Sequence, residues 1–252
     1  MRSPETGVRA RYGMVVDLDR CDGCGVCVVA CAVENNVPAG HERATERTGI
    51  AWLRVQRLEG PAGSAAFLPL MCQQCDARTP CASVCPQNAV QVDASSGIVG
   101  QVPARCLGCR YCMAACPYQA RFFNWWDPEW PGTLVETLNP AVSTRTRGVV
   151  EKCSFCSHRL QAARARQAAD GADRSKPPEY TPACVEACPA GALVFGDLED
   201  PGSEAARLSR SPDCFQLLER LGTGSKVFYR TRRPWLRNAA LGAPGTERRH
   251  DA

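Results

Sequence analysis

Residues 105–120 read RCLGCRYCMAACPYQA, in which a proline follows the last of the four cysteines Cys106, Cys109, Cys112 and Cys116. Three cysteines spaced C-x2-C-x2-C form a tight loop whose thiolates and backbone amides converge on one face of an iron–sulfur cubane. The fourth cysteine is expected on the short helix that leaves this loop, where it points away and ligates a neighbouring cluster. The proline fixes φ and removes an amide donor, so we expect it to start the next extended segment. The stretch predicts one half of a two-cluster unit.

The same plan recurs along the chain. Sixteen of the seventeen cysteines among the 252 residues fall into four groups, each ending in C-x3-C, and prolines follow three of the groups at Pro86, Pro117 and Pro189. An internal repeat of this kind indicates repeated structural units. The groups are Cys21, Cys24, Cys27 and Cys31; Cys72, Cys75, Cys81 and Cys85; Cys106, Cys109, Cys112 and Cys116; and the split group Cys153, Cys156, Cys184 and Cys188.

Other uses of so many cysteines fit the sequence less well. The opening residues MRSPETGVRARYGMVVDLDRC are charged and do not resemble a secretory leader, which argues for metal ligation and against a disulfide framework. Zinc sites normally use two C-x2-C pairs separated by a spacer, often with histidine, and this chain has three histidines. A zinc-stabilised binding module without a redox role is the alternative from another class. The C-x3-C-x2-C loop of a radical enzyme that uses S-adenosylmethionine is absent.

Net charge and hydropathy limit the kinds of partner that the chain is expected to bind. The formal net charge is +4, but a cubane with four thiolates carries roughly −2, so four such sites bring the net charge to roughly −4. We therefore expect no nucleic-acid partner and interpret the basic C-terminal arginines as a solvated surface or docking tail. No run of 18 apolar residues occurs, so no membrane span is expected. The basic residues are Arg230, Arg232, Arg233, Arg237, Arg248 and Arg249.

The segments between the cysteines favour an α+β fold of short strands, short helices and long connecting loops. Brief helices are expected after each third cysteine, with further helices over 154–169 and 214–221. A hairpin is predicted over 89–103, around a Ser-Ser-Gly turn. Short strands are predicted at 13–21, 50–58, 65–72, 192–198 and 226–231.

Some single residues lie near the cysteine pattern without belonging to it. We interpret Cys214 as a buried free thiol, and His158 as a structural histidine, with a hydrogen bond to a cluster sulfur as the alternative. Asp17 and Asp19 surround no pocket that the sequence reveals, so a solvated strand edge is the default interpretation.

A stretch that contains Trp125, Trp126 and Trp130 is interrupted by prolines and cannot bury all three rings in one regular helix. Aromatic residues with arginine neighbours are typical of interface cores, so we expect this stretch to dock a partner, the alternative being a loop folded on its own cluster unit. Residues 163–180 are expected to form a helix end and a polar linker.

Residues 13–200 resemble a known family: the four-cluster iron–sulfur subunits of dimethyl-sulfoxide-reductase-type and polysulfide-reductase-type molybdoenzymes and of alternative complex III. The stretch FNWWDPEWP (123–131) followed by RTRGVVEKCSFC (145–156) is most similar to the alternative complex III and related quinone reductase branch. The resemblance rests on GMVVDLDRCDGCGVCVVAC (13–31), PCASVCP (80–86), RCLGCRYCMAACPYQARFFN (105–124), VVEKCSFCSHRL (149–160) and PACVEACPAGALVFGDLED (182–200).

The resemblance implies two interleaved ferredoxin-like units. The first unit covers 13–60 plus 148–200 and the second covers 61–125, with 126–147 as an aromatic and proline-rich docking loop and 201–252 as a C-terminal extension. It also implies four [4Fe–4S] clusters, one of which is a [3Fe–4S] cluster in some relatives. The implied ligands are Cys21, Cys24, Cys27 and Cys188 for cluster one; Cys153, Cys156, Cys184 and Cys31 for cluster two; Cys72, Cys75, Cys81 and Cys116 for cluster three; and Cys106, Cys109, Cys112 and Cys85 for cluster four.

By the same resemblance, the chain is a non-catalytic subunit that relays single electrons between a large molybdopterin-type catalytic subunit and a multi-span, quinone-binding membrane subunit. Cluster one is expected to face the catalytic partner and cluster four the membrane subunit. A formate dehydrogenase or hydrogenase served by the same relay is the alternative. The chain is expected to be peripheral to the membrane through its partner, on the cytoplasmic face or, after co-export, on the periplasmic face.

Overall fold

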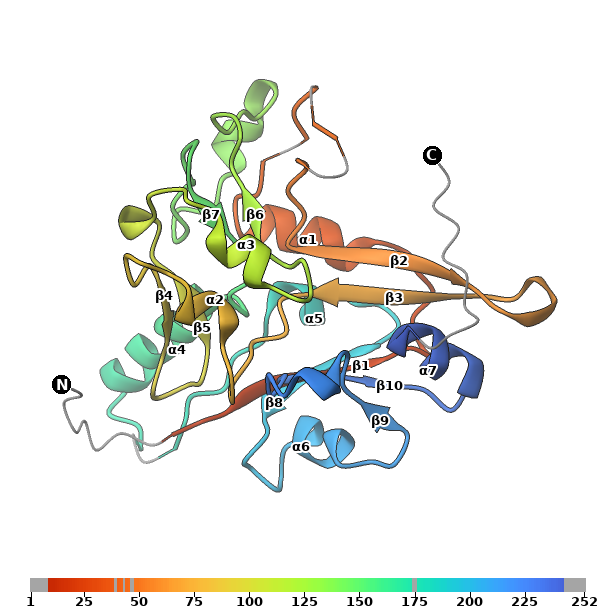
Figure 1. Cartoon of the computed structure of the whole chain (residues 1–252). Coiled ribbons are helices and arrows are strands. Elements are labelled where there is room, and N and C mark those ends of the chain that lie inside the picture. The colour runs from red at the N-terminus through yellow and green to blue at the C-terminus, as the bar shows by residue number, and fades with distance from the viewer. Residues whose placement is uncertain (1–8, 39, 43, 46–47, 174–175, 243–252) are drawn as a thin grey trace.

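The computed structural model describes residues 9–38, 40–42, 44–45, 48–173 and 176–242 (Figure 1). Short helices and short strands alternate along the chain, as the sequence predicts. All ten described strands fall into one four-stranded sheet and three two-stranded antiparallel pairs. The clearest difference from the predicted elements lies in the C-terminal segment.

A four-stranded sheet in the order β8-β1-β10-β9 forms the lower part of the molecule in Figure 1. Strand β1 (Tyr12–Asp17) lies between β8 (Leu193–Asp197), which is antiparallel to it, and β10 (Val227–Arg230), which is parallel. Every residue of β1 is buried, because helices and loops cover both faces of the strand. A fully buried strand of this kind provides a rigid support for the cysteine loop that follows it.

Three hairpins make up the remaining strands. Strands β2 (Leu53–Glu59) and β3 (Ala65–Met71) pair along their whole length and are joined by the 3-10 turn η1 (Pro61–Gly63). This long hairpin projects to the right in Figure 1. The predicted hairpin over 89–103 is confirmed by β4 (Val90–Val92) and β5 (Val99–Gln101), and η2 (Pro103–Arg105) follows it. The third hairpin pairs β6 (Phe122–Phe123) with β7 (Val150–Glu151).

Four of the helices near the cysteines, α1, α2, α3 and α5, are short and begin one residue before a cysteine. The longest helix, α4, begins at Ser157 and not at residue 154, because Phe155 and Cys156 have positive φ angles that no α-helix accepts. A separate 3-10 turn, η3 (Gly132–Thr137), lies in the predicted docking loop. The helices are α1 (Val26–Glu34), α2 (Pro80–Ser83), α3 (Tyr111–Ala115), α4 (Ser157–Ala169), α5 (Ala183–Glu186), α6 (Glu204–Ser209) and α7 (Pro234–Leu241).

The prediction of a helix over 214–221 is wrong. The segment begins as β9 (Cys214–Phe215), which pairs with β10, and ends in the 3-10 turn η4 (Glu219–Leu221). Leu218 between them has φ 50°, which interrupts any helix. Residues 201–242 thus supply two of the four strands of the main sheet, a role that the sequence left open.

The acidic pair Asp17 and Asp19, at the end of β1, binds the basic C-terminal segment. This contact corrects two interpretations made from sequence. Asp17 is only 7% exposed and accepts a hydrogen bond from Nη1 of Arg230 at 2.9 Å. Asp19 accepts hydrogen bonds from Thr231 Oγ1 at 2.7 Å and from Arg233 Nε at 2.8 Å. These aspartates are therefore an anchor and not a solvated strand edge. Arg230 and Arg233 are likewise intramolecular contacts and not a free docking tail.

The remaining basic residues of that segment either contact their own chain at the surface or lie beyond the described residues. The guanidinium of Arg237 lies over the Phe215 ring at 5.4 Å from its centroid, and Nη1 donates to the carbonyl of Pro212. The backbone amide of Arg232 donates to Asp19. Arg248 and Arg249 lie outside the described residues.

In the part of the chain that the structure describes, no helix combines the length and the apolar character required to cross a membrane.

The C-terminal helix offers a matched test of how much this segment stabilises the fold. Leu236 and Leu241 lie on the same helix, α7, but Leu236 is fully buried and Leu241 is 40% exposed. We expect Leu236→Ala to lower the free energy of unfolding by about 2–5 kcal/mol, because it leaves a cavity. Leu241→Ala should change it by no more than about 0.5 kcal/mol. Anaerobic denaturant titration measures both values, and equal losses would contradict an anchored α7.

Candidate cluster sites

The first two cysteines of the first and third groups lie on loops that glycine shapes. Gly23 and Gly108 occupy equivalent places before the second cysteine of their groups, with φ angles of 78° and 74°. The next turn residue is also left-handed in both loops, and it is Gly25 in one and Arg110 in the other. These angles bend the chain so tightly that successive cysteine side chains point to the same side of the loop.

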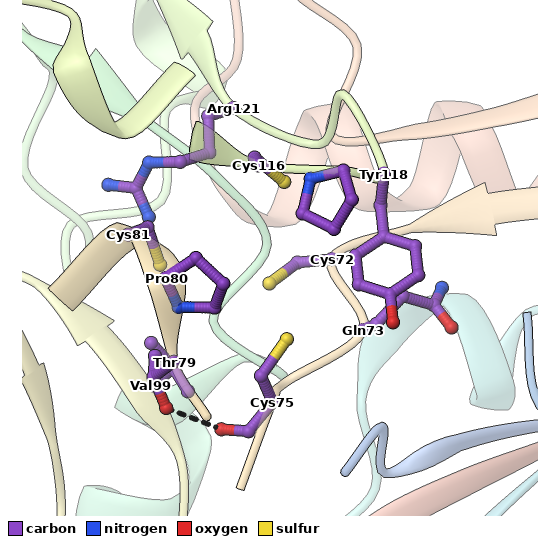
Figure 2. Close-up of a pocket in the computed structure, with 11 residues that line it drawn as sticks. Cys72, Gln73, Cys75, Thr79, Pro80, Cys81, Val99, Cys116, Tyr118 and Arg121 are labelled. Atoms are coloured by element: carbon purple, nitrogen blue, oxygen red, sulfur yellow. Dashed lines mark hydrogen bonds between the residues drawn. The ribbon is translucent and has the colours of Figure 1, made fainter. Parts of the chain in front are cut away.

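Four cysteines converge in the second unit, and we call this group site three: Cys72, Cys75, Cys81 and Cys116. Their side chains surround a common cavity that holds about 330 Å³ of space free of protein atoms, part of it open to solvent. Figure 2 shows the four sulfur atoms pointing into this space from different segments of the chain. The three-cysteine group and the fourth cysteine of the next group therefore meet, as the sequence predicts for exchanged ligands.

A second cavity of about 310 Å³ is lined by the cysteines of site four, which are Cys85, Cys106, Cys109 and Cys112. Cys106 and Cys109 come from the loop before α3, and Cys112 is buried on α3 itself. Cys85 reaches the same cavity from the end of the preceding group. Each of the two cavities is thus lined by three cysteines of one group and the last cysteine of the other.

The first and last groups are also brought together, in sites one and two. Burial and then the nearby thiols of Cys21, Cys188 and Cys24 raise the pKa of Cys27 to about 11, and we call these four residues site one. Burial and then the thiols of Cys153, Cys184 and Cys156 raise the pKa of Cys31 well above its ordinary value. We call Cys31, Cys153, Cys156 and Cys184 site two.

The donor set at these sites fits a positively charged group. Burial is the main reason why the pKa of Cys75 is raised to about 12, and the thiols of its own site add to the shift. Such thiols lose their protons only when a nearby cation balances the negative charge of the thiolate. Metal binding therefore displaces these protons. Among the described residues, no His, Cys, Asp or Glu side chains converge closely enough to hold a single ion. A polyatomic iron–sulfur core suits cavities of this size better than zinc does.

Each cysteine-proline step makes a turn, which corrects the prediction that the proline starts an extended segment. After Cys85 the chain folds back so that the amide of Ala89 donates to Cys85 Sγ at 3.2 Å. After Cys188 the amide of Ala192 donates to Cys188 Sγ at 3.3 Å in the same way. The residue before each of these alanines has a positive φ, and so does Gln119, which holds the equivalent place after Cys116. Proline at the second position of the turn presets its φ angle, and an N–H donor then faces the sulfur.

The predicted location of the fourth cysteine on a helix is right for only one group. Cys31 lies within α1, whereas Cys116 ends α3 in an extended conformation. Cys85 and Cys188 lie two residues beyond the last residues of α2 and α5. The helices are shorter than expected because the proline that follows the cysteine prevents the helix from continuing.

Thiols of different sites influence one another. Burial and the thiols of its own site raise the pKa of Cys184 of site two, and Cys27 of site one adds to the shift. Burial is also the largest cause that raises the pKa of Cys153 and of Cys112, to which Cys72 and Cys81 of site three contribute in turn. These influences fit the order one-two-three-four.

Buried polar side chains close the seam between sites two and three. Gln74 donates from Nε2 to the carbonyl of Cys153 at 2.9 Å and accepts the amide of Val99 at 2.8 Å. Lys152, only 2% exposed, donates to the carbonyls of the same two residues, Val99 and Cys153. These bonds hold the second unit against the loop that carries Cys153. Neither Gln74 nor Lys152 could be identified from the cysteine pattern.

One further residue that the sequence did not reveal contacts ligand sulfur directly. Nδ2 of the buried Asn35 lies 3.7 Å from Cys31 Sγ and 3.7 Å from Cys156 Sγ, and it also donates to the carbonyl of Cys31. It follows Cys31 by four residues, the same offset at which Ala89 and Ala192 donate to sulfur. That spacing is the only sequence signal that points to it.

His158 and Cys214 line neither of the two cavities. His158 Nε2 pairs with Glu34 Oε1 at 2.6 Å, and Arg159 binds the same carboxylate, so His158 ties α4 to α1 and the structural interpretation is confirmed. Cys214 lies half-buried on β9 as a free thiol, and burial raises its pKa to about 11. It lines neither cavity.

The aromatic stretch folds partly on its own chain. The Arg110 guanidinium lies over the rings of both Phe123 and Trp125, at 5.3 and 4.9 Å from their centroids. The Trp126 ring stacks on that of His41 at 4.5 Å. Trp130 is half-buried, whereas residues 131–137 are exposed. Two of the three tryptophans thus make contacts within the chain, and the longest exposed run of the loop is 131–137, which contains η3.

Two family models match the chain: a 4Fe-4S dicluster domain over residues 64–130 and a 4Fe-4S binding domain over residues 18–34. The first match contains all the cysteines of sites three and four, and the second contains the first cysteine group. Together with the cavities, these matches define a ferredoxin-like protein that binds multiple [4Fe–4S] clusters.

Relatives with the same plan extend over nearly the whole chain. The iron–sulfur cluster-binding subunit of menaquinone reductase from Nitratidesulfovibrio vulgaris is 46% identical over 235 residues, covering 91% of this chain and 92% of that protein. Iron–sulfur subunit 1 of an Hdr-like menaquinol oxidoreductase from Archaeoglobus fulgidus is 40% identical, with coverages of 91% and 87%. The matching tetrathionate reductase subunit from Salmonella typhimurium is 37% identical, with coverages of 89% and 74%.

The chain belongs to this family of iron–sulfur, electron-transfer subunits of reductase complexes, as its cysteine motifs predict. It is not a catalytic subunit.

The loop of site four permits a test of its geometry. A Cβ at Gly108 would lie 2.4 Å from the carbonyl oxygen of Gly148, whereas a Cβ at Gly25 would meet nothing within 4 Å, although both residues have positive φ. Gly25→Ala should therefore cost only the backbone strain, about 1–3 kcal/mol. Gly108→Ala should cost more and should release the irons of site four. Unfolding free energy and iron content, measured on the same anaerobic samples, check this, and indistinguishable variants would refute the proposed close packing.

Proposed function

We propose that the chain carries four [4Fe–4S] clusters in series and relays single electrons across the subunit. The proposed ligands are those predicted from the sequence: Cys21, Cys24, Cys27 and Cys188 in site one; Cys31, Cys153, Cys156 and Cys184 in site two; Cys72, Cys75, Cys81 and Cys116 in site three; and Cys85, Cys106, Cys109 and Cys112 in site four. The convergence of four cysteines on each of two cavities is the observation that carries this proposal.

The division into units follows from the same ligand sets. Sites one and two draw on residues 13–60 and 148–200, and sites three and four draw on 61–125, so each unit exchanges cysteines only within itself. Support for interleaving comes from β1 and β8, which pair across the chain and bring the first and fourth groups together. A bound cluster supplies one-electron transfer with little change in geometry. The protein residues hold the sulfur atoms, exclude water from the buried ones and donate N–H groups to them.

The two ends of the series lie at the surface. Cys24 of site one and Cys109 of site four are exposed, whereas the cysteines of site two are buried. Leu107 and Tyr111 are exposed beside Cys109, at 56% and 65%. Apolar side chains next to an exposed ligand favour close docking of a partner, which would shorten the path for the electron.

We propose that these ends meet two different partners. Site one would face a large catalytic subunit of the molybdopterin type, and site four a multi-span, quinone-binding membrane subunit. Relatives whose names include menaquinone reductase, menaquinol oxidoreductase and tetrathionate reductase support both kinds of partner. The exposed loop 126–147 would add to one interface. This arrangement makes the chain peripheral to the membrane through its partners.

Serine substitutions at the two exposed ends test the proposal. In the purified complex, Cys109→Ser and Cys24→Ser should each remove or convert one cluster. A variant that loses one cluster completely should contain about four fewer irons than the roughly sixteen per wild-type chain. With an artificial dye as electron donor or acceptor at the catalytic subunit, Cys109→Ser should keep most of the activity and lose most of the quinone-linked turnover. Cys24→Ser should also lose quinone-linked turnover, because the series is broken next to the catalytic partner.

Iron analysis, low-temperature paramagnetic resonance and the two activities are measured on each sample. A colourless protein that contains zinc would refute the proposal. If Cys109→Ser reduced the dye-linked and quinone-linked activities equally, the assigned position of site four would be wrong.

A further inference from the structure

Arg121 is the residue whose environment the fold and the ligand sets do not explain. It follows Ala120 at the end of the turn after Cys116, and it is only 3% exposed. Its Nη2 donates to Oε1 of Gln101. Its Nε and Nη1 are buried and donate to no nitrogen or oxygen atom in the described part of the protein, while the Cys112 thiol interacts with the guanidinium. Burying an N–H donor without a partner costs on the order of 1–3 kcal/mol, and more on a charged group, so these donors point to a group that binds in the cavity.

The guanidinium lies at the boundary between sites three and four. It lines the cavity of site three and, in Figure 2, extends beside Cys81. Burial lowers the pKa of Arg121 and the thiols of Cys81, Cys112 and Cys72 raise it, and the side chain is charged because a guanidinium does not lose its proton in proteins. Cys81 and Cys72 belong to site three and Cys112 to site four.

No acidic side chain among the described residues neutralises this charge. Of the ion pairs that these residues form, none includes Arg121. Arg145 shows the contrast, because this equally buried guanidinium pairs with the carboxylate of Glu151. A buried charge without a counter-ion is strongly disfavoured. Within the described chain, the cysteine thiolates and the clusters that they hold are the only negative groups placed against Arg121.

We propose that Arg121 is the counter-charge shared by clusters three and four, and that it favours the reduced form of both. The inference rests on the ligand sets proposed above. One-electron reduction adds one negative charge to a cluster and breaks no bond, so a fixed positive charge nearby stabilises the reduced form. In a buried site this attraction is stronger than at the protein surface. The two unpartnered N–H groups add hydrogen bonds to sulfur, which act in the same direction.

The position of Arg121 confines its effect to the second unit. Sites one and two lie beyond the seam formed by Gln74 and Lys152, and no thiol of site one is among the groups that influence Arg121. The second unit should therefore have higher reduction potentials than it would without Arg121, while the potentials of sites one and two stay nearly unchanged. Arg121 therefore places a positive charge next to the two clusters and is not itself a ligand.

Three substitutions separate charge from hydrogen bonding. Arg121→Met removes both, Arg121→Gln keeps an N–H donor, and Arg121→Lys keeps the charge. Arg207→Met removes one charge from an exposed position on α6 and is the control. Each full-length variant is purified anaerobically in its complex. Its clusters are titrated with redox mediators and followed by low-temperature paramagnetic resonance, with iron content measured in parallel.

In Arg121→Met we expect the equilibrium constant for reduction to fall at least about tenfold at two of the four clusters, a shift of about 59 mV for a one-electron couple. Arg121→Lys should keep most of the wild-type value, Arg121→Gln should lie between the two, and Arg207→Met should match wild type. If Arg121→Met fails to retain iron, the Lys and Gln variants decide the question by themselves. Unchanged potentials in all iron-replete Arg121 variants, or equal shifts at all four clusters, would overturn the inference.

Failure of this inference is distinguishable from failure of the proposed function. If wild-type protein shows four cluster signals and the Arg121 variants do not move them, only the role of Arg121 is lost. If wild-type protein shows no iron–sulfur signals, the ligand sets themselves are wrong.

Discussion

The structure depends on the burial of thiols that face one another across small cavities. A protein core usually gains stability by packing apolar side chains, but in the second unit eight cysteines line two cavities instead of filling them. Burial raises the pKa of thiols such as Cys75 and Cys27, so the cavity walls resist ionisation until a cationic core binds. Cluster binding is therefore coupled to folding, as in other small metal-dependent domains. The short strands and helices serve mainly to hold the loops at a fixed separation.

The same local turn occurs three times in these loops. The cysteine-proline turn folds the chain back, and the residue just before the donor amide has a positive φ in each copy, at Asn88, Gln119 and Gly191. Two of the three positions are not glycine, so their left-handed conformation is strained. The same conformation brings an N–H group to the sulfur. The copy after Cys116 leads directly into Ala120 and Arg121. The turn that supplies a backbone donor to site three thus also carries the buried guanidinium to its place.

Much of this could be predicted from the sequence, because cysteine spacing is a strong constraint on local geometry. The ligand groups, the strand before Cys21 and the hairpin over 89–103 depend on short-range patterns, and the structure has the strand and the hairpin. The errors arose where long-range contacts decide the outcome. Residues 214–221 have a helical composition, yet pairing with β10 makes Cys214 and Phe215 a strand. Asp17 and Asp19 resemble surface residues in the sequence, because their partners Arg230 and Arg233 lie more than 200 positions away.

The parallel pairing of β1 with β10 has a consequence for biosynthesis. Strand β1 is made first among the described elements, and its second neighbour is the last strand of the chain. Closing a loop of this length is slow compared with local turns, because contacts distant in sequence carry a large entropic cost before they contribute stability. The nascent polypeptide therefore keeps one sheet edge open until translation has passed residue 230. Cofactor insertion into the earlier cysteine groups thus has the whole period of synthesis in which to occur before the fold closes.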